Sequence, residues 1–182
     1  MVNIVTIDGQ RYLVDVGFGG DNASRPMAMT PGVEVAGIGP QRLRLEYKTL
    51  AQRSDRSQKV WVYAHRAGDD APWIEGYCFT ETEFFAADFE VMNWSTMTAP
   101  QGFFVQNVVC VLVLLGEGGK PAAQLSLFNG RVSRRENGEA TVVQELKSEE
   151  QRVEALGKWF RIQLEPEQRN GIIGLSSELR GE

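Results

Sequence analysis

Two short apolar runs near the start of the chain flank the dipeptide Asp8-Gly9. These runs, residues 2–7 and 10–16, are rich in β-branched side chains. An Asp-Gly pair between such runs is the strongest short-range signal for a β-hairpin, because both turn residues must accept positive φ angles. The segment therefore predicts two antiparallel strands joined by a two-residue turn, and the second strand leads into the glycine-rich residues 17–20.

The turn also determines which residues face one another across the hairpin, with Ile7 opposite Gln10. Because side chains alternate along a strand, one face is expected to carry Val2, Ile4, Thr6, Arg11, Leu13 and Asp15. The position that would precede Met1 lies on this face, as a diagonal neighbour of Asp15 at roughly 7 Å. A histidine there could be oriented by the Asp15 carboxylate, as in a nucleophile–histidine–acid triad, but the sequence begins one residue later.

Two segments of the chain resemble one enzyme family. The run VTIDGQRYLVDVGFG, residues 5–19, looks like the central motif of the arylamine N-acetyltransferases. The run DFEVMNWSTMTAP, residues 88–100, is similar to the segment that enters the C-terminal domain in that family, and Phe104 and Cys110 follow it downstream. The first motif is hard to obtain by chance, because the glycine-rich run is joined directly to the hairpin.

The resemblance implies roles for particular residues. In the family, the aspartate of the DVGFG run completes a Cys-His-Asp triad, and here that aspartate is Asp15. By the same resemblance, Gly17, Phe18 and Gly19 contribute to the acceptor pocket. Phe18 is equally well explained as a core aromatic residue.

The resemblance also implies contacts with coenzyme A, at Ser95, Thr98, Gln101 and Gly102. The motif departs from the family pattern at Ala99, where a serine usually precedes the proline, and at Gln101-Gly102, where serine or threonine is common. These departures leave two hydroxyl groups and the backbone amides to bind the cofactor. A plain connection between two domains is the alternative explanation of residues 95–102.

The implied activity is transfer of an acyl group to an aromatic amine or hydrazine, a reaction of xenobiotic metabolism. The acyl donor would be acetyl-CoA or another acyl-CoA, with acetyl, propionyl and malonyl groups all open, and the acyl group would pass through a cysteine thioester. Neither the family's catalytic cysteine in its Arg-Gly-Gly context nor its catalytic histidine is among the 182 residues. We interpret the chain as a truncated member that needs the missing N-terminal segment for activity; the alternatives are a non-catalytic binding or regulatory fragment and an incomplete gene model.

The expected fold class is α+β, and the family resemblance divides the chain into three parts. Residues 1–80 are expected to form a partial antiparallel β-barrel, 81–102 an inter-domain helix and turn, and 103–182 an α/β lid domain. Alternation and apolar runs predict strands at residues 42–47, 59–63, 73–79, 103–115, 123–128 and 140–144. Capping-box patterns predict two helices, one from Thr80 to Asn93 and one from Ser148 to Gln163.

Composition excludes several classes of function. The 19 basic and 24 acidic residues give a net charge of −5, which argues against nucleic acid as a partner. No signal-peptide pattern is present, and the longest apolar run is too short to span a bilayer, so we expect a cytoplasmic protein with no membrane partner. Cys78 and Cys110 are expected to be reduced and buried, and His65 exposed. One histidine and two cysteines cannot supply a zinc site, so no metal cofactor is expected.

Overall fold

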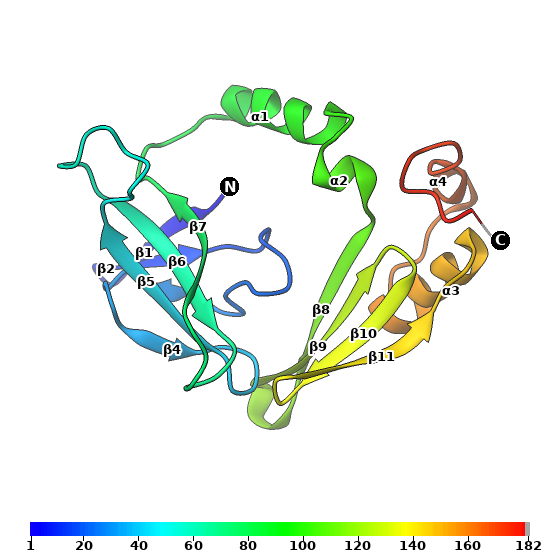
Figure 1. Cartoon of the computed structure of the whole chain (residues 1–182), viewed down its shortest axis with the longest axis horizontal. Coiled ribbons are helices and arrows are strands. Elements are labelled where there is room, and N and C mark those ends of the chain that lie inside the picture. Colours follow the sequence, from blue (N-terminus) through cyan, green and yellow to red (C-terminus); the bar gives the residue numbers. More distant parts are fainter. Residues whose placement is uncertain (181–182) are drawn as a thin grey trace. The chain divides into compact units, whose positions relative to one another are not determined.

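The computed structural model describes residues 1–180, which form an α+β fold with antiparallel sheets (Figure 1). The chain divides into two compact units. The first unit comprises residues 1–82, 115–123 and 136–139, and the second comprises residues 83–114, 124–135 and 140 onwards. The three domain ranges expected from the sequence stay a prediction.

The predicted hairpin is present at the start of the first unit. It belongs to a three-stranded sheet in the order β1 (Asn3–Ile7), β2 (Gln10–Val14) and β3 (Met27–Ala28). Ile7 lies opposite Gln10, as predicted, and the turn residues Asp8 and Gly9 have φ angles of 50° and 78°. The register of this hairpin could therefore be predicted from the turn alone.

A second sheet of the first unit holds the other half of its core. Its strand order is β4 (Glu34–Ala36), β5 (Arg42–Lys48), β6 (Val60–Arg66) and β7 (Ile74–Phe79). The predicted strands at 42–47, 59–63 and 73–79 are confirmed within one residue at most ends. Alternate side chains of the two sheets share one core, which includes Leu13, Met27, Leu43, Leu45, Trp61 and Tyr63. Val2 and Ile4 pack against the same core, so the hairpin face predicted to carry them is covered by the unit itself.

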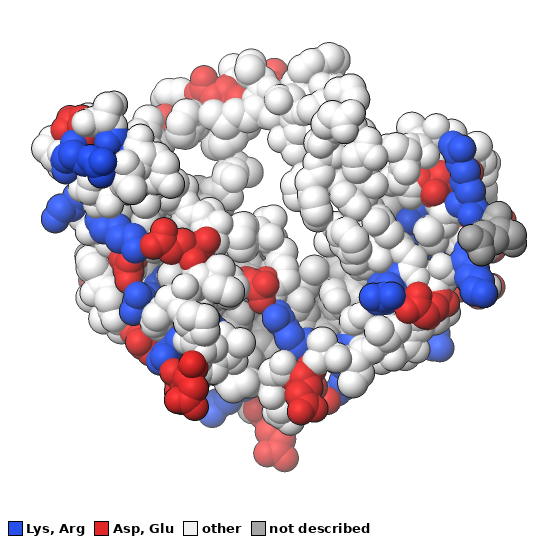
Figure 2. Space-filling view, in the orientation of Figure 1, with Lys and Arg blue, Asp and Glu red and all other residues white. Residues whose placement is uncertain are grey.

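None of the sheets in residues 1–180 closes into a barrel. The partial barrel expected from the family resemblance therefore stays a proposal. Basic and acidic side chains are mixed on the visible face of the molecule, and the surface over α1 (Ala86–Thr98) is mostly uncharged (Figure 2).

The second unit is built around a four-stranded sheet in the order β11-β10-β9-β8. The bounds of its elements are α2 (Phe103–Gln106), β8 (Val109–Leu115), β9 (Pro121–Phe128), β10 (Arg131–Glu136), β11 (Glu139–Glu145), α3 (Glu149–Phe160) and α4 (Pro166–Asn170), with a short 3-10 turn at Glu117–Gly119. Its core contains Leu125, Leu127, Val132, Leu146, Ala155 and Phe160. One face of the sheet thus packs against α3.

The structure differs from the sequence predictions at three places in the second unit or at its start. Residues 103–106 form a helical turn and not a strand, because the Gly102 carbonyl accepts hydrogen bonds from the amides of Val105 and Gln106, each at 3.0 Å. Strand β10 was not predicted, although the turns on both sides of it were. The helix expected from residue 80 begins at Ala86 and continues to Thr98.

The start of α1 has a clear physical cause. The Asp88 carboxylate accepts a hydrogen bond from the backbone N–H of Phe85 at 2.8 Å, which satisfies a donor that the first turn leaves free. The Thr80 hydroxyl instead bonds the Thr82 hydroxyl at 3.1 Å. The second predicted helix is confirmed at its start, where the Ser148 hydroxyl accepts from the amide of Gln151.

The two thiols and the histidine differ from expectation. Cys78 is exposed and not buried, because Tyr77 and Phe79 on either side of it point to the core and the strand alternates. Cys110 is half-buried against the second core, and this burial raises the pKa of its thiol. His65 is half-buried and stacks on Tyr63, with ring centroids 6.2 Å apart.

Candidate functional site

Asp15 follows β2 and is almost completely buried, with 7% of its surface exposed. Its carboxylate oxygen Oδ1 accepts a hydrogen bond from the backbone N–H of Gly17 at 2.8 Å. Its backbone carbonyl accepts one from the Asn22 side chain at 2.7 Å. These two bonds hold the glycine-rich loop against the end of the hairpin, so the position of the carboxylate is fixed by its own loop.

Phe18 lies over the edge of the second sheet with 43% of its surface exposed. Its ring centroid is 4.8 Å from that of Tyr77 and 6.2 Å from that of Tyr63. A Cβ at Gly76 would lie 3.2 Å from the ring atoms of Phe18, so glycine at that position permits the contact. Gly19 has a φ of 101°, which only glycine adopts readily.

The two tyrosines place hydroxyl groups beside the acid. Tyr63 donates to the backbone carbonyl of Asp21 at 2.5 Å, and its pKa is raised by burial and then by the Asp21 and Asp15 charges. The pKa of Tyr77 is raised by burial and then by the neighbouring Asp15 carboxylate. The Tyr77 hydroxyl is buried and makes no hydrogen bond of regular geometry within the described residues. Asp15 therefore sits in an aromatic, largely dry environment.

The sequence predicted part of this cluster. Asp15, Gly17 and Phe18 were named as candidates, and they lie together. Tyr63 and Tyr77 were missed, along with Gly76. Aromatic residues stand at every second position of two predicted strands, at Trp61 and Tyr63 and then at Tyr77 and Phe79, and this spacing could have indicated a shared aromatic face.

The four predicted cofactor residues lie along one helix–turn–helix segment of the second unit. Ser95 and Thr98 are in the last turn of α1, both exposed, and the Thr98 hydroxyl donates to the carbonyl of Trp94 at 2.6 Å. Gln101 is exposed in the turn, and the N–H of Gly102 donates to the carbonyl of Ala99 at 2.7 Å. A Cβ at Gly102 would lie 2.9 Å from that carbonyl oxygen, so the turn requires glycine.

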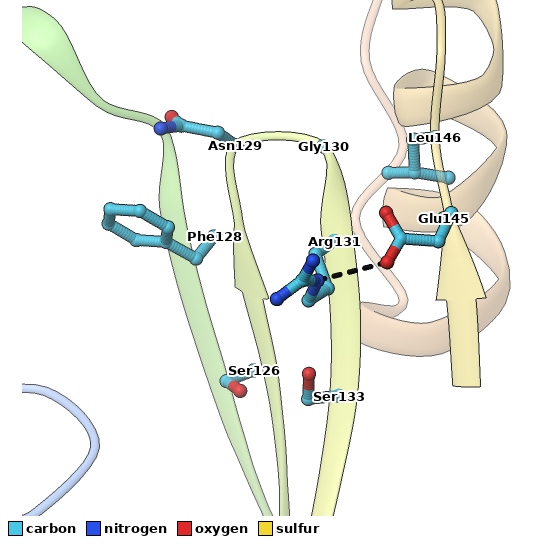
Figure 3. A pocket seen from close by; sticks show the side chains of 8 residues that line it. All are labelled: Ser126, Phe128, Asn129, Gly130, Arg131, Ser133, Glu145 and Leu146. Carbon is cyan, nitrogen blue, oxygen red and sulfur yellow. Dashed lines mark hydrogen bonds and ion pairs between the residues drawn. The ribbon is translucent and has the colours of Figure 1, made fainter. Parts of the chain in front are cut away.

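A shallow hollow of about 340 Å³ lies on the sheet of the second unit, near the turn between β9 and β10 (Figure 3). Its lining residues are Ser126, Phe128, Asn129, Gly130, Arg131, Ser133, Glu145 and Leu146. An exposed ion pair between Arg131 and Glu145, 3.0 Å long, crosses one side of it. None of the predicted site residues lines this hollow.

Residues 1–180 contain no group of three or more His, Cys, Asp or Glu side chains arranged to hold a metal ion. No helix in the same part of the chain is long and apolar enough to cross a membrane.

A family described as N-acetyltransferase matches residues 1–169. The chain belongs to the arylamine N-acetyltransferase family. Curated relatives from two species carry the name N-malonyltransferase FDB2. The protein from Fusarium pseudograminearum (strain CS3096) is 32% identical over an alignment 182 residues long, which covers 94% of this chain and 53% of that protein. The protein from Gibberella moniliformis is 29% identical over 180 residues, covering 94% and 52%. The chain thus spans about half the length of these relatives.

Members of the family with solved structures share the fold. The arylamine N-acetyltransferase from Mycobacterium abscessus has a TM-score of 0.76 at 16% identity, covering 93% of this chain and 56% of that one. The Mycobacterium marinum arylamine N-acetyltransferase, solved in complex with CoA, has a TM-score of 0.71 at 24% identity, covering 88% and 53%. At these identities the likeness concerns the fold.

Proposed function

We propose that this chain carries the acid and the acceptor wall of an acyl-CoA-dependent N-acyltransferase. The observation that carries the proposal is the buried carboxylate of Asp15 at the end of the hairpin, held by Gly17 and faced by aromatic rings. A buried acid of this kind suits the third member of a triad, which orients a histidine and stabilises its protonated form. Membership of the arylamine N-acetyltransferase family supports this assignment.

The proposed reaction has two half-reactions. A cysteine thiolate attacks the thioester carbonyl of an acyl-CoA, an acyl-cysteine thioester forms, and coenzyme A leaves as the thiol with a proton from the histidine. The amine nitrogen then attacks the acyl-cysteine, the histidine takes its proton, and the cysteine thiolate is restored. Asp15 holds the imidazole in the tautomer that both steps need.

Neither cysteine of this chain suits the nucleophile. Cys78 is exposed on the face of the edge strand β7 opposite to Tyr77, and therefore points away from Asp15. Cys110 lies against an apolar core that raises the pKa of its thiol. A raised pKa leaves less of the reactive thiolate near neutral pH. We therefore propose that the nucleophile and the histidine are not among these 182 residues, and that the chain alone does not transfer acyl groups.

The proposed acceptor is an aromatic amine or hydrazine. The half-exposed ring of Phe18 packs on Tyr77 and on the buried Tyr63 and offers an apolar surface beside Asp15, and flat aromatic substrates stack favourably on such surfaces. Gly17 and Gly19 are assigned to the same surface because they bring the backbone close without adding side chains.

The proposed donor is an acyl-CoA, held at Ser95, Thr98, Gln101 and Gly102. Exposed hydroxyl and amide groups suit hydrogen bonds to phosphate or pantetheine. The CoA complex of the Mycobacterium marinum enzyme supports this donor class. Acetyl-CoA is one candidate, and malonyl-CoA is a second, because two relatives are named N-malonyltransferases.

A chimera tests the proposal. It joins the part of the Fusarium pseudograminearum relative that precedes the match to the start of this chain, and it is assayed with acetyl-CoA, malonyl-CoA and an aniline. The chimera is expected to transfer an acyl group, and Asp15→Asn is expected to lower kcat by a factor on the order of 10⁴. Asp8→Asn is the matched control, because Asp8 is an exposed acid in the same hairpin and asparagine also suits its turn.

Three results would contradict the proposal. Asp15→Asn activity within tenfold of the parent chimera would remove the acid role. Turnover by the 182-residue chain alone at the rate of the chimera would show that its own residues suffice. A folded chimera without any transfer activity would favour the non-catalytic alternative.

A further inference from the structure

The proposed donor segment, residues 95–102, is connected to the sheet through α2 and through Asn107, which follows α2. The Gln106 side chain donates to the carbonyl of Pro100 at 2.5 Å, and the Asn107 side chain donates to the carbonyl of Phe103 at 2.9 Å. Both bonds tie the helical turn to itself and to the loop before it. Neither one fixes the segment to the rest of the unit.

Asn129, at the turn between β9 and β10, provides one such attachment (Figure 3), and the Ser176 hydroxyl, which donates to the carbonyl of Val105 at 3.1 Å, provides another. The Oδ1 of Asn129 accepts from the backbone N–H of Val108 at 2.9 Å, and its Nδ2 donates to Oδ1 of Asn107 at 2.8 Å. Its own backbone N–H donates to the carbonyl of Val108 at 2.9 Å. A backbone N–H can only donate, so the side-chain atom of Asn129 that faces the N–H of Val108 must be the amide oxygen. The amide nitrogen of Asn129 then faces Asn107, and the atom of Asn107 that it meets must be an oxygen.

Asn129 is itself held firmly. Its φ is 51°, a left-handed conformation that asparagine tolerates better than most residues. The carbonyl of Gly130 accepts from the amide of Leu146 at 2.7 Å, and a Cβ at Gly130 would lie 2.9 Å from the Leu146 carbonyl oxygen. The buried Arg152 guanidinium lies 3.5 Å from the carbonyl of Asn129. The turn is thus a fixed support on the sheet side.

We propose that Asn129 is a positioning residue for the acyl-CoA donor segment. This proposal rests on the donor site assigned above. Its side chain joins the β9–β10 turn to Asn107, Asn107 joins α2, and Gln106 of α2 joins the loop at Pro100. Losing the Asn129 side chain removes its two hydrogen bonds to this segment, and leaves the backbone bond between Asn129 and Val108, the bond from the Ser176 hydroxyl to Val105 and the ring contact between Phe103 and Phe128. The donor half-reaction then weakens, whereas the acceptor wall in the first unit is unaffected.

Asn137 supplies a matched control. It has the same φ of 51° at the turn between β10 and β11, but no hydrogen bond of its side chain is found within the described residues. Asn129→Gly and Asn137→Gly remove the same atoms from the same backbone conformation. Asn107→Ala is a second test, because it breaks the contact from the other side without changing the turn.

The first measurement is amide hydrogen exchange on the 182-residue chain. Asn129→Gly and Asn107→Ala are expected to speed exchange at residues 103–108 by about tenfold or more, with α3 unchanged. Asn129→Gly removes the bonds to Val108 and Asn107, and Asn107→Ala removes the bonds to Asn129 and Phe103. Asn137→Gly is expected to leave residues 103–108 as in the parent. Equal exchange in the Asn129 and Asn137 variants, or faster exchange spread over α3, would overturn the proposal.

The second measurement is steady-state kinetics of the chimera. In a two-step transfer, kcat/KM for the donor reports the first half-reaction and kcat/KM for the amine reports the second. Asn129→Gly is expected to lower the donor value at least fivefold and to leave the acceptor value unchanged. Equal losses in both would indicate general destabilisation and overturn the positioning role. If the chimera is active but its rate does not saturate with acyl-CoA, the proposed donor site is wrong. The hydrogen-exchange data would then test only whether Asn129 positions α2.

Discussion

Two of the Arg–Glu pairs in the second unit differ mainly in burial. Arg152 and Glu149 pair within α3, with side chains 2% and 19% exposed. Arg131 and Glu145 pair across β10 and β11 at 3.0 Å, with side chains 60% and 58% exposed. The two pairs contain the same groups, so replacing each arginine by methionine isolates the effect of burial.

The buried arginine is expected to matter far more for the free energy of unfolding. Arg152 donates to both oxygens of Glu149 and to the carbonyl of Ser177 at 2.9 Å. Removing one partner of a buried pair typically costs about 3–5 kcal/mol, because the remaining charge and acceptors lose their partners. Glu149 keeps some solvent and a bond from the N–H of Leu179 at 2.7 Å, so the lower end, about 3 kcal/mol, is expected for Arg152→Met.

The exposed pair gives the control value. Arg131→Met is expected to change the free energy of unfolding by less than about 1 kcal/mol, since exposed pairs contribute little. Adding Glu149→Gln to Arg152→Met is expected to recover at least about 1 kcal/mol, because no unpaired carboxylate is then left. Urea unfolding of dilute protein, followed by circular dichroism, measures all four values. Equal losses for the Arg152 and Arg131 variants would refute the reasoning.

Two further predictions concern the first unit. The Glu81 carboxylate accepts from the guanidinium of Arg11 at 2.6 and 2.9 Å and from the indole of Trp61 at 2.8 Å, and these bonds lower its pKa from 4.5 to about 2. The ionised carboxylate with its lowered pKa stabilises the fold above pH 4.5, and this stabilisation is lost as the pH falls towards about 2. Tm should therefore fall more steeply over that range in the parent than in Glu81→Gln. Asp15→Asn is expected to change the free energy of unfolding by less than about 1 kcal/mol, because the asparagine oxygen can still accept from Gly17; a loss above about 2 kcal/mol in urea would assign Asp15 a structural role.

Local signals account for the parts of the fold that could be predicted. Asp8-Gly9 sets the turn, the register and the face of Asp15 within a few residues, so no distant contact is needed. The start of α3 likewise follows from Ser148 and its neighbour three residues on. These signals concern backbone conformation, which nearby residues largely decide.

The parts that could not be predicted depend on distant partners. Tyr77 comes to lie beside Asp15 only because two sheets share one core. Strand β10 has a charged sequence with a single buried apolar residue, Val132, and it is a strand because its neighbours pair with it. Residues 103–106 read as part of an apolar strand, but the hydrogen bonds to the Gly102 carbonyl turn them into a helix. The sequence predicts Asn129 only as a turn residue. Its hydrogen bond to Asn107 could not be predicted, because the fold brings the two residues together.

The surface of α1 leads to a last prediction, on self-association. This helix has no buried residue, and the apolar side chains along it include Val91, Trp94 and Met97, which are 74%, 67% and 59% exposed. Strand β1 adds an open edge, because within residues 1–180 it pairs with β2 alone. Exposed apolar patches and bare strand edges both favour association. We expect the 182-residue chain to associate in a concentration-dependent way.

Size-exclusion chromatography with light scattering tests this expectation, together with a dye that reports exposed apolar surface. Val91→Lys with Trp94→Lys should lower the mass towards the 20.3 kDa of a single chain, because charged side chains on the helix oppose its burial in a contact. Ile173→Lys is the control, since Ile173 is 64% exposed and lies outside α1. A sharp peak of single-chain mass and low dye binding for the parent would contradict the prediction. If Ile173→Lys lowers the mass as much as the α1 variants do, added charge and not the surface of α1 would explain the loss of association, because Ile173→Lys leaves the helix surface unchanged.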